Sequence, residues 1–450
     1  MSPPDARGRG GERRGRCQNR TVAPQTVTPA AVRPDRAPGA DPLPSDGIPS
    51  DGMPSDPLPY DAILLYSFGG PNGPADVLPF LRNVTRGKHI PEARLVEVGA
   101  HYDHFGGRSP INGHNLELIA ALHEELGRRG VDLPIGFGNR NWEPYTVDAL
   151  ADLRAGGARR VLAIVTSAYG SYSGCRQYRE NLAATLAALA AQPAADDAAA
   201  VPALVVDKLR HYFNHPGFVQ ANAEAIADAY AALRARREAG AGAAGGGAGD
   251  AASAAPLVFV THSIPDVMEE GSGAQRPSYA AQHLDVAALV AARVAELVGH
   301  AVPWRLAFCS RSGPPSQPWL EPDVNDVLKE LSGEGVRSVV LSPIGFISDH
   351  MEVAFDLDTE AMETAAELGL TAVRAGTVST RPAFVAGLVD LVLERAARER
   401  GEDVEPVAVG ALGAWPDVCR AGCCRQRAGV DSGVPAACGE DSDPTEWTAS

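Results

Sequence analysis

The stretch Ala62-Ile-Leu-Leu-Tyr-Ser-Phe68 decides the fold, because it is an almost unbroken apolar run at the start of the ordered sequence. Such a run is typical of a β-strand buried on both faces, as the strands of parallel sheets are. The run stops at Gly69-Gly70-Pro71, residues that end a strand and begin a loop. We therefore predict that the folded part of the chain begins with a strand of a parallel sheet.

Similar apolar runs recur along the chain and alternate with helix-like stretches. This alternation predicts parallel sheets with crossover helices, and hence a doubly wound α/β protein with two Rossmann-like halves. The further strands are predicted at Arg160–Thr166, Ala203–Val206, Leu257–Thr261, Arg305–Phe308 and Val336–Leu341. The helices are predicted at Asn115–Arg129, Tyr145–Ala155, Gly217–Arg237 and Tyr279–Leu297.

Changes of composition divide the chain into four parts. Residues 1–56 are rich in Pro, Gly, Arg and Asp and lack apolar periodicity, which predicts a disordered arm. We place an N-terminal α/β half at 57–200, a C-terminal half at 201–400 and a cysteine-containing tail at 401–450. The Ala/Gly tract at 239–256 is expected to be a surface loop, because the α/β alternation continues on both sides of it.

The composition indicates an acidic protein, with 45% hydrophobic residues, 21% charged residues and a formal net charge of −16. This charge argues against nucleic acid as the main partner. No segment approaches the roughly eighteen uninterrupted apolar residues of a membrane span, and the N-terminus lacks the apolar segment of a secretory signal. We therefore expect a cytoplasmic protein without a membrane span. The sequence carries no signal for the oligomeric state, and a monomer is the favoured expectation.

A histidine follows an apolar strand in Val260-Thr-His-Ser-Ile-Pro265. Functional groups of open α/β sheets gather where strands end and loops begin. An imidazole at such a place can act as a base or a metal ligand near neutral pH. The alternative is that His262 only caps the strand by bonding to the backbone, and the residues alone leave both interpretations open.

Three carboxylates, Glu352, Asp356 and Glu360, follow the strand that ends near Leu341. On an α-helix, positions i, i+4 and i+8 form one narrow stripe, where like charges repel unless a cation compensates them. An ordinary solvated acidic face is the common alternative. Against this alternative, the stripe does not sit on a purely polar surface, because apolar residues surround it: Met351, Val353, Phe355 and Leu357.

The cysteines form a second group of candidate ligands. The chain has 7 cysteines, and an odd number in a long chain without a signal peptide favours metal or redox chemistry over disulfides. Cys419, Cys423 and Cys424 lie too close together in sequence to be core packing. Thiolates gathered in this way select soft metals or iron–sulfur clusters, and a zinc site is the competing interpretation.

Two segments closely resemble the signature motifs of ferrochelatases: Thr261-His-Ser-Ile-Pro265 and Pro343-Ile-Gly-Phe-Ile-Ser-Asp-His-Met-Glu-Val353. The resemblance is closest to the actinobacterial branch and implies a lyase of haem biosynthesis. Its members insert ferrous iron into coproporphyrin III to give coproheme, and the next enzyme of the pathway is a further candidate partner. Five more segments resemble the family in the same order: Ser67–Pro71, Phe105–Asn112, Gly138–Pro144, Tyr172–Tyr178 and Pro318–Asp323.

The resemblance implies a role for each candidate residue. His262 and Glu352 would bracket the ring centre as metal ligands or proton acceptors. Glu352, Asp356 and Glu360 would form a relay for ferrous iron or protons, because oxygen ligands and imidazole suit this ion. Substrate propionates would be bound by the hydroxyls of Ser109 and Tyr178 and by the guanidinium of Arg86.

Many actinobacterial members bind a [2Fe-2S] cluster through three C-terminal cysteines and a distant one. The resemblance therefore implies Cys175, Cys419, Cys423 and Cys424 as cluster ligands, with Cys438 as a replacement for one of the adjacent pair. Iron insertion transfers no net electrons, so we expect the cluster to serve stability or sensing.

Two residues depart from related sequences. Phe68 stands where some members have tyrosine, so no metal ligand is expected there, and Cys309 stands where relatives often have glutamine and is expected to pack. Three other functions stay open: a protoporphyrin IX ferrochelatase, a non-catalytic porphyrin or haem carrier, and a cobalt or nickel chelatase. A carrier would not need both His262 and Glu352, which favours the enzyme.

Overall fold

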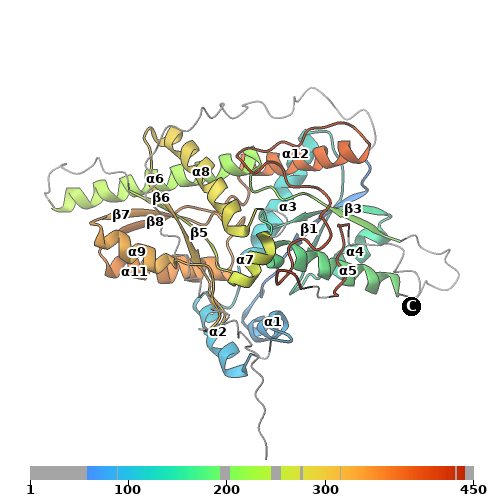
Figure 1. Cartoon of the computed structure of the whole chain (residues 1–450), viewed down its shortest axis with the longest axis horizontal. Helices are drawn as coiled ribbons and strands as arrows, with labels where there is room; N and C mark the ends of the chain where they lie inside the picture. The colour runs from blue at the N-terminus through green and yellow to red at the C-terminus, as the bar shows by residue number, and fades with distance from the viewer. Residues whose placement is uncertain are drawn as a thin grey trace, which may run out of the picture. The chain divides into compact units, whose positions relative to one another are not determined.

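Eight parallel strands form two four-stranded sheets in the described part of the chain (Figure 1). The computed structural model describes residues 58–88, 90–192, 203–244, 255–273, 277–314, 316–430 and 433–440. The predicted arm at 1–56 lies outside these residues. The predicted α/β class with two parallel sheets is confirmed.

The first sheet has the strand order β2-β1-β3-β4. All six residues of β1 (Ala62–Ser67) are buried, as a strand covered on both faces requires. It pairs in parallel with β2 and β3, and β3 pairs with β4. The neighbouring strands are β2 (Ile135–Asn139), β3 (Arg160–Val165) and β4 (Val205–Lys208).

The second sheet has the order β6-β5-β7-β8, and all its strands are parallel. Its central strand β5 (Leu257–His262) is buried except at its last residue. Because β5 lies between β6 and β7, its carboxyl end brings His262 to the middle of a sheet edge. The other strands are β6 (Trp304–Cys309), β7 (Ser338–Ser342) and β8 (Thr371–Arg374).

Helices cover the sheets, and one hydrophobic core contains residues from both of them, including Ile63 of β1 and Phe259 of β5. The long helices α6, α8 and α12 contribute to this shared core, whereas α1 and α2 lie together at one end (Figure 1). In the first half the helices are η1 (Pro74–Asp76), α1 (Val77–Val84), α2 (Glu92–His104), α3 (Ile111–Arg128), α4 (Thr146–Ala155), η2 (Tyr172–Arg176) and α5 (Gln177–Ala190). The others are α6 (Pro216–Ala244), α7 (Asp266–Gly273), α8 (Tyr279–Val298), α9 (Val324–Gly333), α10 (Met351–Phe355), η3 (Asp356–Glu360), α11 (Ala361–Glu367) and α12 (Pro382–Glu399).

The structure adds two strands that the apolar pattern does not predict, β2 and β8. The sequence of β2 is Ile-Gly-Phe-Gly-Asn, and its two glycines break the apolar run. Gly138 is needed there, because an added Cβ would lie 2.7 Å from the Cα of Thr146. Helix α6 continues through Ala244 and so enters the Ala/Gly tract at 239–256, which was predicted to be a loop.

The passage between the halves follows β4. This strand pairs with β3 in the first sheet, so the chain leaves that sheet after Lys208, beyond the boundary predicted at residue 200. A buried ion pair then fixes this passage to α12, since Arg210 lies 2.7 Å from Glu394. Arg210 also donates to the carbonyl of Val407 at 2.7 Å.

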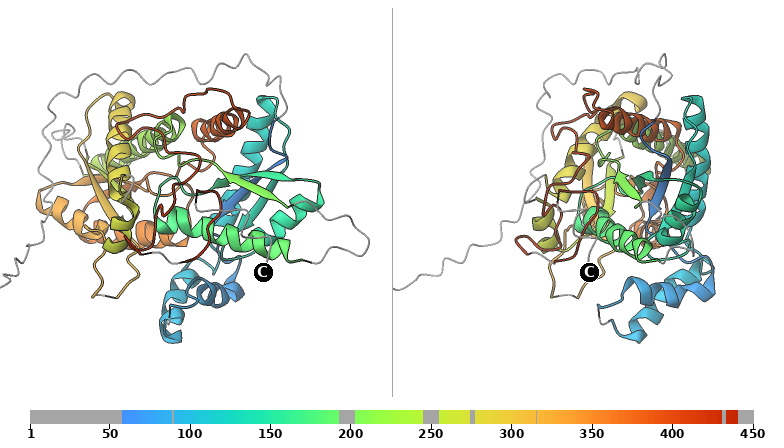
Figure 2. Two further views of the ribbon diagram at one scale, coloured as in Figure 1. Left: turned by 45° about the vertical axis from the view of Figure 1, so that its right-hand side comes forward. Right: turned by 90° about the vertical axis from the view of Figure 1, so that its right-hand side faces the viewer.

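The tail after α12 forms no helix or strand in residues 401–430 and 433–440, apart from one bridge between Cys419 and Gly439. It returns to the first half and lies against α5, as the dark red trace in Figure 2 shows. The Nε of Arg179 in α5 donates to the carbonyl of Ala437 at 2.6 Å. The amide of Ala437 donates back to the carbonyl of Arg179 at 3.0 Å.

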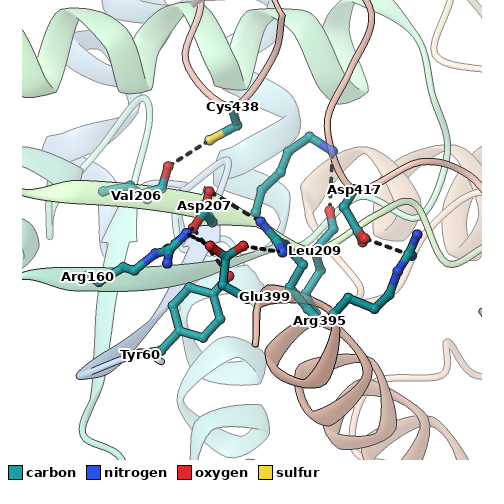
Figure 3. Close-up of polar contacts among 11 residues, drawn as sticks. Tyr60, Arg160, Val206, Asp207, Leu209, Arg395, Glu399, Asp417 and Cys438 are labelled. Atoms are coloured by element: carbon teal, nitrogen blue, oxygen red, sulfur yellow. Dashed lines mark hydrogen bonds and ion pairs between the residues drawn. The ribbon is translucent and has the colours of Figure 1, made fainter. Parts of the chain in front are cut away.

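Ion pairs connect α12 to the first sheet and to the tail (Figure 3). The tail is reached by Arg398 of α12, which lies 2.7 Å from Asp417. Arg160 of β3 reaches both Asp207 of β4, at 2.7 Å, and Glu399 of α12, at 2.5 Å. Arg395 contacts the same two carboxylates, at 3.5 and 2.7 Å. Arg160 and Arg395 therefore each have two carboxylate partners, one from the sheet and one from the helix.

Candidate functional site

A cavity of about 510 Å³ lies where the carboxyl ends of both sheets converge, a volume within the usual range for small-molecule sites. Loops that follow strands of both sheets supply much of its lining, as expected for open α/β sheets. They include Phe68–Gly70 after β1, Arg140 and Asn141 after β2, Ser263–Pro265 after β5 and Gly345–Ser348 after β7. Helices α1 and α2 add apolar residues on one side: Phe80, Leu81, Val84 and Val98.

His262 and Glu352 meet in this cavity. The Nε2 of His262 lies 3.3 Å from Oε2 of Glu352. The Nδ1 of His262 is 2.5 Å from the carbonyl of Ser263. A carbonyl only accepts, so Nδ1 carries a hydrogen and Nε2 is the nitrogen that exchanges a proton toward the cavity.

The contact between His262 and Glu352 shifts the pKa of each residue toward its charged form. Burial alone would raise the pKa of Glu352, but the hydrogen bond and charge of His262 outweigh it and lower this pKa to about 2. Burial would likewise lower the pKa of His262, yet Glu352 and the Ser263 carbonyl raise it above its usual value. The Glu352 side chain is 52% exposed and lines the cavity, so solvent reaches it there although protein surrounds it. Its charge is therefore partly screened.

His350 orients Glu352 by capping the helix that carries it. It has extended backbone at the N-cap of α10, and its Nδ1 accepts a hydrogen bond of 3.2 Å from the amide of Glu352. Such a cap satisfies an otherwise unpaired amide of the first helical turn. Burial lowers the pKa of His350, which favours the neutral ring that this cap requires.

Asp356 lies at the junction of α10 with the π-helical turn η3 and also lines the cavity. Burial raises the pKa of Asp356 to about 7, against a hydrogen bond from Ser310, and the charges of Glu352 and Glu360 raise it further. Ser310 holds its position with a φ of 60°, which is uncommon for a residue other than glycine. Glu360, at the far end of η3, is exposed and lies outside the cavity lining.

The three residues predicted to bind propionates differ in their position. Ser109 and Tyr178 are buried and line the cavity. Gly70 permits the approach of Ser109, because an added Cβ at Gly70 would lie 2.7 Å from the Ser109 Cβ. Arg86 is exposed and outside the lining, where it donates to Asn83 at 2.9 Å.

Sequence reasoning missed Arg140, a cation of the cavity wall. Its guanidinium lies 4.6 Å from the ring centre of Tyr178 and 5.7 Å from that of Phe68, as in cation–π contacts. Its Nε and Nη1 are buried without a hydrogen-bond partner. Arg140 belongs to the Gly138–Pro144 motif and directly follows β2, a position where functional residues are expected. The glycines of β2 interrupt its apolar pattern, so the sequence did not predict that a strand ends there.

Four cysteines come together, as the resemblance implies. Cys175, Cys419, Cys423 and Cys424 are all buried and form one cluster, with 3.5 Å between the sulfurs of Cys423 and Cys424. Cys438 is not in this cluster, and its sulfur contacts the carbonyl of Val206 at 3.1 Å. Four converging thiols fit the ligand set of a [2Fe-2S] cluster. However, no group of three or more His, Cys, Asp or Glu side chains in the described residues is arranged to hold a metal ion.

The cysteine cluster and the cavity share one wall. Cys175 belongs to the π-helical turn η2, whose Tyr172, Ser173 and Gly174 line the cavity. Gln426, two positions beyond Cys424, also lines the cavity. Cys309 is buried at the end of β6 beside His262 and packs into a separate hydrophobic core, as expected.

Among the described helices, none is long and apolar enough to cross a lipid bilayer.

Comparisons with known proteins identify the family to which the chain belongs. The family described as Ferrochelatase matches residues 60–396. A protein of Streptomyces griseus named Coproporphyrin III ferrochelatase is 52% identical, over 85% of this chain and 96% of that protein. A protein of the same name from Leifsonia xyli is 48% identical over 81% of this chain and 90% of that protein. One from Rhodopirellula baltica, named Ferrochelatase, is 44% identical over 81% and 93%. The chain therefore belongs to the ferrochelatase family.

Proposed function

We propose that this ferrochelatase inserts ferrous iron into coproporphyrin III and releases coproheme. The observation that carries the proposal is the pairing of His262 with Glu352 at 3.3 Å in a cavity lined by both sheets. The names of the Streptomyces and Leifsonia relatives support coproporphyrin III as the substrate. Protoporphyrin IX is the second candidate, because the Rhodopirellula relative bears the general family name.

Insertion requires the porphyrin to lose two pyrrole protons and the iron to lose its water ligands. The Nε2 of His262 and the Glu352 carboxylate face the same space and can accept protons or hold the ion as it enters the ring. The Nδ1–H bond to Ser263 fixes the ring, so proton exchange is confined to Nε2. No electron transfer is involved, and the released protons pass to this pair and to water.

Asp356 is proposed as the next ligand on the path of iron, because it lines the cavity one helical turn beyond Glu352. Its raised pKa means that it takes up a proton readily near neutral pH, which suits a group that exchanges iron for protons. Glu360 is proposed as the outer end of this relay, since it is exposed and influences Asp356 through its charge.

The carboxylates of the substrate need cations and hydroxyls in the cavity wall. Arg140 offers two buried nitrogens without partners, and a guanidinium binds carboxylate through parallel hydrogen bonds. Ser109 and Tyr178 add hydroxyls to the lining of the same cavity. We therefore propose Arg140, Ser109 and Tyr178 as propionate ligands, whereas Arg86 stays a prediction from the family resemblance.

The test is anaerobic incubation of the protein with ferrous iron and each porphyrin in turn, followed by absorption spectroscopy. We expect the spectrum of coproheme to appear with coproporphyrin III and to form more slowly with protoporphyrin IX. The reverse preference would assign protoporphyrin IX as the substrate. Tight binding of either porphyrin without metal insertion would identify a carrier and overturn the proposal.

We also propose that Cys175, Cys419, Cys423 and Cys424 hold a [2Fe-2S] cluster. The convergence of four buried thiols from η2 and the tail supports this ligand set over one containing Cys438. When bound, the cluster would join η2 to the tail through four iron–sulfur bonds. The purified protein should contain iron and acid-labile sulfide and absorb visible light.

Two variants separate the cluster ligands from other cysteines. Cys419→Ser should abolish the visible absorption, whereas Cys438→Ser should keep it. Loss in both variants would show that the ligand set is different, and unchanged absorption in Cys419→Ser would contradict the assignment.

A further inference from the structure

Arg374, the last residue of β8, binds two aspartates that flank the proposed iron ligands. Its Nη1 and Nη2 donate to the two carboxylate oxygens of Asp349, at 3.1 and 3.0 Å. Its Nε and Nη2 donate to the two oxygens of Asp358, both at 2.7 Å. One planar guanidinium therefore holds two carboxylates, each through the paired hydrogen bonds that make arginine–carboxylate contacts strong and directional.

The two aspartates lie at the two ends of the segment that carries the reacting carboxylates. Asp349 directly precedes the N-cap of α10, the helix that contains Glu352. Asp358 belongs to the π-helical turn η3 and follows Asp356 by two residues. Glu352 and Asp356 are therefore enclosed between the two contacts with Arg374.

Apolar packing holds another side of this segment. Val353 and Leu357 are buried in one hydrophobic core. Hydrophobic contacts are not directional, so they leave open how the segment is rotated and where its carboxylates point. The turn η3 is also an uncommon conformation, of a kind that occurs frequently at functional sites. The directional hydrogen bonds of Arg374 supply the restraint that apolar packing lacks.

The ion pairs of Arg374 are largely shielded from solvent. The side chains of Arg374 and Asp349 are 14% and 21% exposed, and that of Asp358 is 38% exposed. Burial alone would lower the pKa of Arg374, but the hydrogen bonds and charges of the two aspartates raise it above its usual value. The guanidinium therefore keeps its charge, and both pairs persist under the conditions of the reaction.

We propose that Arg374 is a positioning residue, which clamps both ends of the segment 349–358 so that Glu352 faces His262 and Asp356 faces the cavity. This inference rests on the proposed function, because that function assigns both carboxylates to the path of iron. Arg374 itself does not belong to the cavity lining that the described residues form. Its effect on the reaction must therefore pass through the two aspartates.

Loss of the clamp should impair iron insertion and leave porphyrin binding unchanged. In Arg374→Met we expect kcat/KM for ferrous iron to fall by about 10- to 100-fold, because a displacement of about 1 Å at a reacting group can cost two orders of magnitude. The dissociation constant of coproporphyrin III should stay the same, since its proposed ligands belong to the first half: Ser109, Arg140 and Tyr178. A merely structural role would lower the stability in urea without this selective kinetic change.

Charge alone predicts a different result from loss of position. Arg374→Met removes a positive charge, which would favour capture of a cation, whereas Asp358→Ala removes a negative charge, which would disfavour it. The clamp predicts a decrease in both variants. Arg305→Met is the matched control, because Arg305 lies on β6, the opposite edge strand of the same sheet, and also bridges two carboxylates, Glu330 at 3.1 Å and Glu334 at 2.6 Å. Its kinetics should equal those of the unsubstituted protein.

The experiment uses the full-length protein under anaerobic conditions. Initial rates of coproheme formation are followed by absorption at increasing concentrations of ferrous iron, porphyrin affinity is measured by fluorescence quenching, and circular dichroism checks the fold. Unchanged iron kinetics in Arg374→Met, or opposite changes in Arg374→Met and Asp358→Ala, would overturn the clamp. A parallel loss of porphyrin affinity would show general loosening and would also overturn it.

A further variant decides the question if Arg374→Met does not fold. Arg374→Lys keeps the charge but cannot hold both carboxylates through paired hydrogen bonds. A lower kcat/KM for iron with unchanged porphyrin affinity supports the clamp in this variant, and unchanged kinetics overturns it. If the unsubstituted protein inserts iron into neither porphyrin, the proposed function fails and this inference fails with it. Normal insertion in the unsubstituted protein and in the Arg374 variants would overturn this inference alone.

Discussion

His262 combines two contacts that together define its chemistry. The Ser263 carbonyl holds Nδ1, and the Glu352 carboxylate faces Nε2 at 3.3 Å. We expect His262→Ala to lower the rate of iron insertion by about 10²- to 10⁴-fold, the usual contribution of a positioned acid or base. Porphyrin affinity, measured by fluorescence quenching, should change little.

A matched control for this variant is His300→Ala, because His300 is exposed and its Nδ1 bonds to the carbonyl of the neighbouring Ala301. Its rate should equal that of the unsubstituted protein. Full activity in His262→Ala would remove the proposed role.

Asp356 should give the reaction a dependence on pH. Burial raises its pKa to about 7, and Glu352, Glu360 and His262 are the titrating groups that influence it. Because the ionised carboxylate binds iron, the rate should rise as the pH increases through about 7, and Asp356→Asn should remove this rise. The folded pKa lies above the unfolded one, so this group lowers the unfolding free energy as pH rises from about 4 to 7. An unchanged rate profile in Asp356→Asn would contradict its role.

Arg140 and Arg86 provide a direct comparison of two candidate propionate ligands. Hydrogen bonds to charged groups contribute about 1.5–3 kcal/mol, so Arg140→Met should weaken porphyrin binding by roughly one to two orders of magnitude. Arg86→Met should have a much smaller effect, because its side chain lies outside the cavity lining. The dissociation constants of both variants, measured with coproporphyrin III, decide between the two residues.

The sequence predicted some of these residues and missed others for physical reasons. His262 was found because an unbroken apolar strand leads directly to it. Arg140 was missed because Gly136 and Gly138 interrupt the apolar pattern of β2. The spacing argument for the carboxylates assumed a regular α-helix, whereas the π-helical turn η3 separates Asp356 from Glu360 and leaves only the former in the cavity.

The turn η2 is the element that serves both the cavity and the cysteine cluster. The hydroxyl of Ser171 caps it by accepting from the amide of Gly174 at 2.9 Å. Gly174 has little space, because an added Cβ would lie 2.7 Å from Oγ of Ser167 and 3.0 Å from the carbonyl of Tyr169. A side chain at this position must push aside the Ser167 hydroxyl or shift η2 away from the Tyr169 carbonyl.

Gly174→Ala should therefore affect two measurements at once. We expect weaker porphyrin binding, together with reduced visible absorption from the cysteine site. Gly113→Ala is the matched control, because an added Cβ at Gly113 of α3 meets nothing within 4 Å. An effect of Gly174→Ala on one measurement alone would show that η2 does not connect the two sites.

Across the whole molecule, the two halves are joined by charges that the sequence could not place. The alternation of strands and helices predicted two sheets, but it could not show that Arg160 of β3 would meet Glu399 of α12 or that the tail would return to α5. Such pairs depend on how distant segments pack, and no local periodicity encodes them.

The buried pair of Arg210 and Glu394 should be important for stability. Their side chains are 1% and 3% exposed. Glu394→Ala leaves an unpaired buried cation, and we expect the unfolding free energy to fall by about 3–5 kcal/mol in urea denaturation. The double variant Arg210→Met/Glu394→Leu should recover most of this loss, because a well-packed apolar pair is often as stable as a buried ion pair. A double variant as unstable as the single one would show that the charges themselves are required.

The return of the tail to η2 has a consequence for protein synthesis. Cys175 leaves the ribosome early, and its three partner cysteines follow only after both sheets and α12 have been made. A chain that ended before Cys419 would still contain His262, Glu352 and the strands that position them, but it could not assemble the four-thiol site. The presence of that site therefore distinguishes a chain translated through its tail from one interrupted after the catalytic residues.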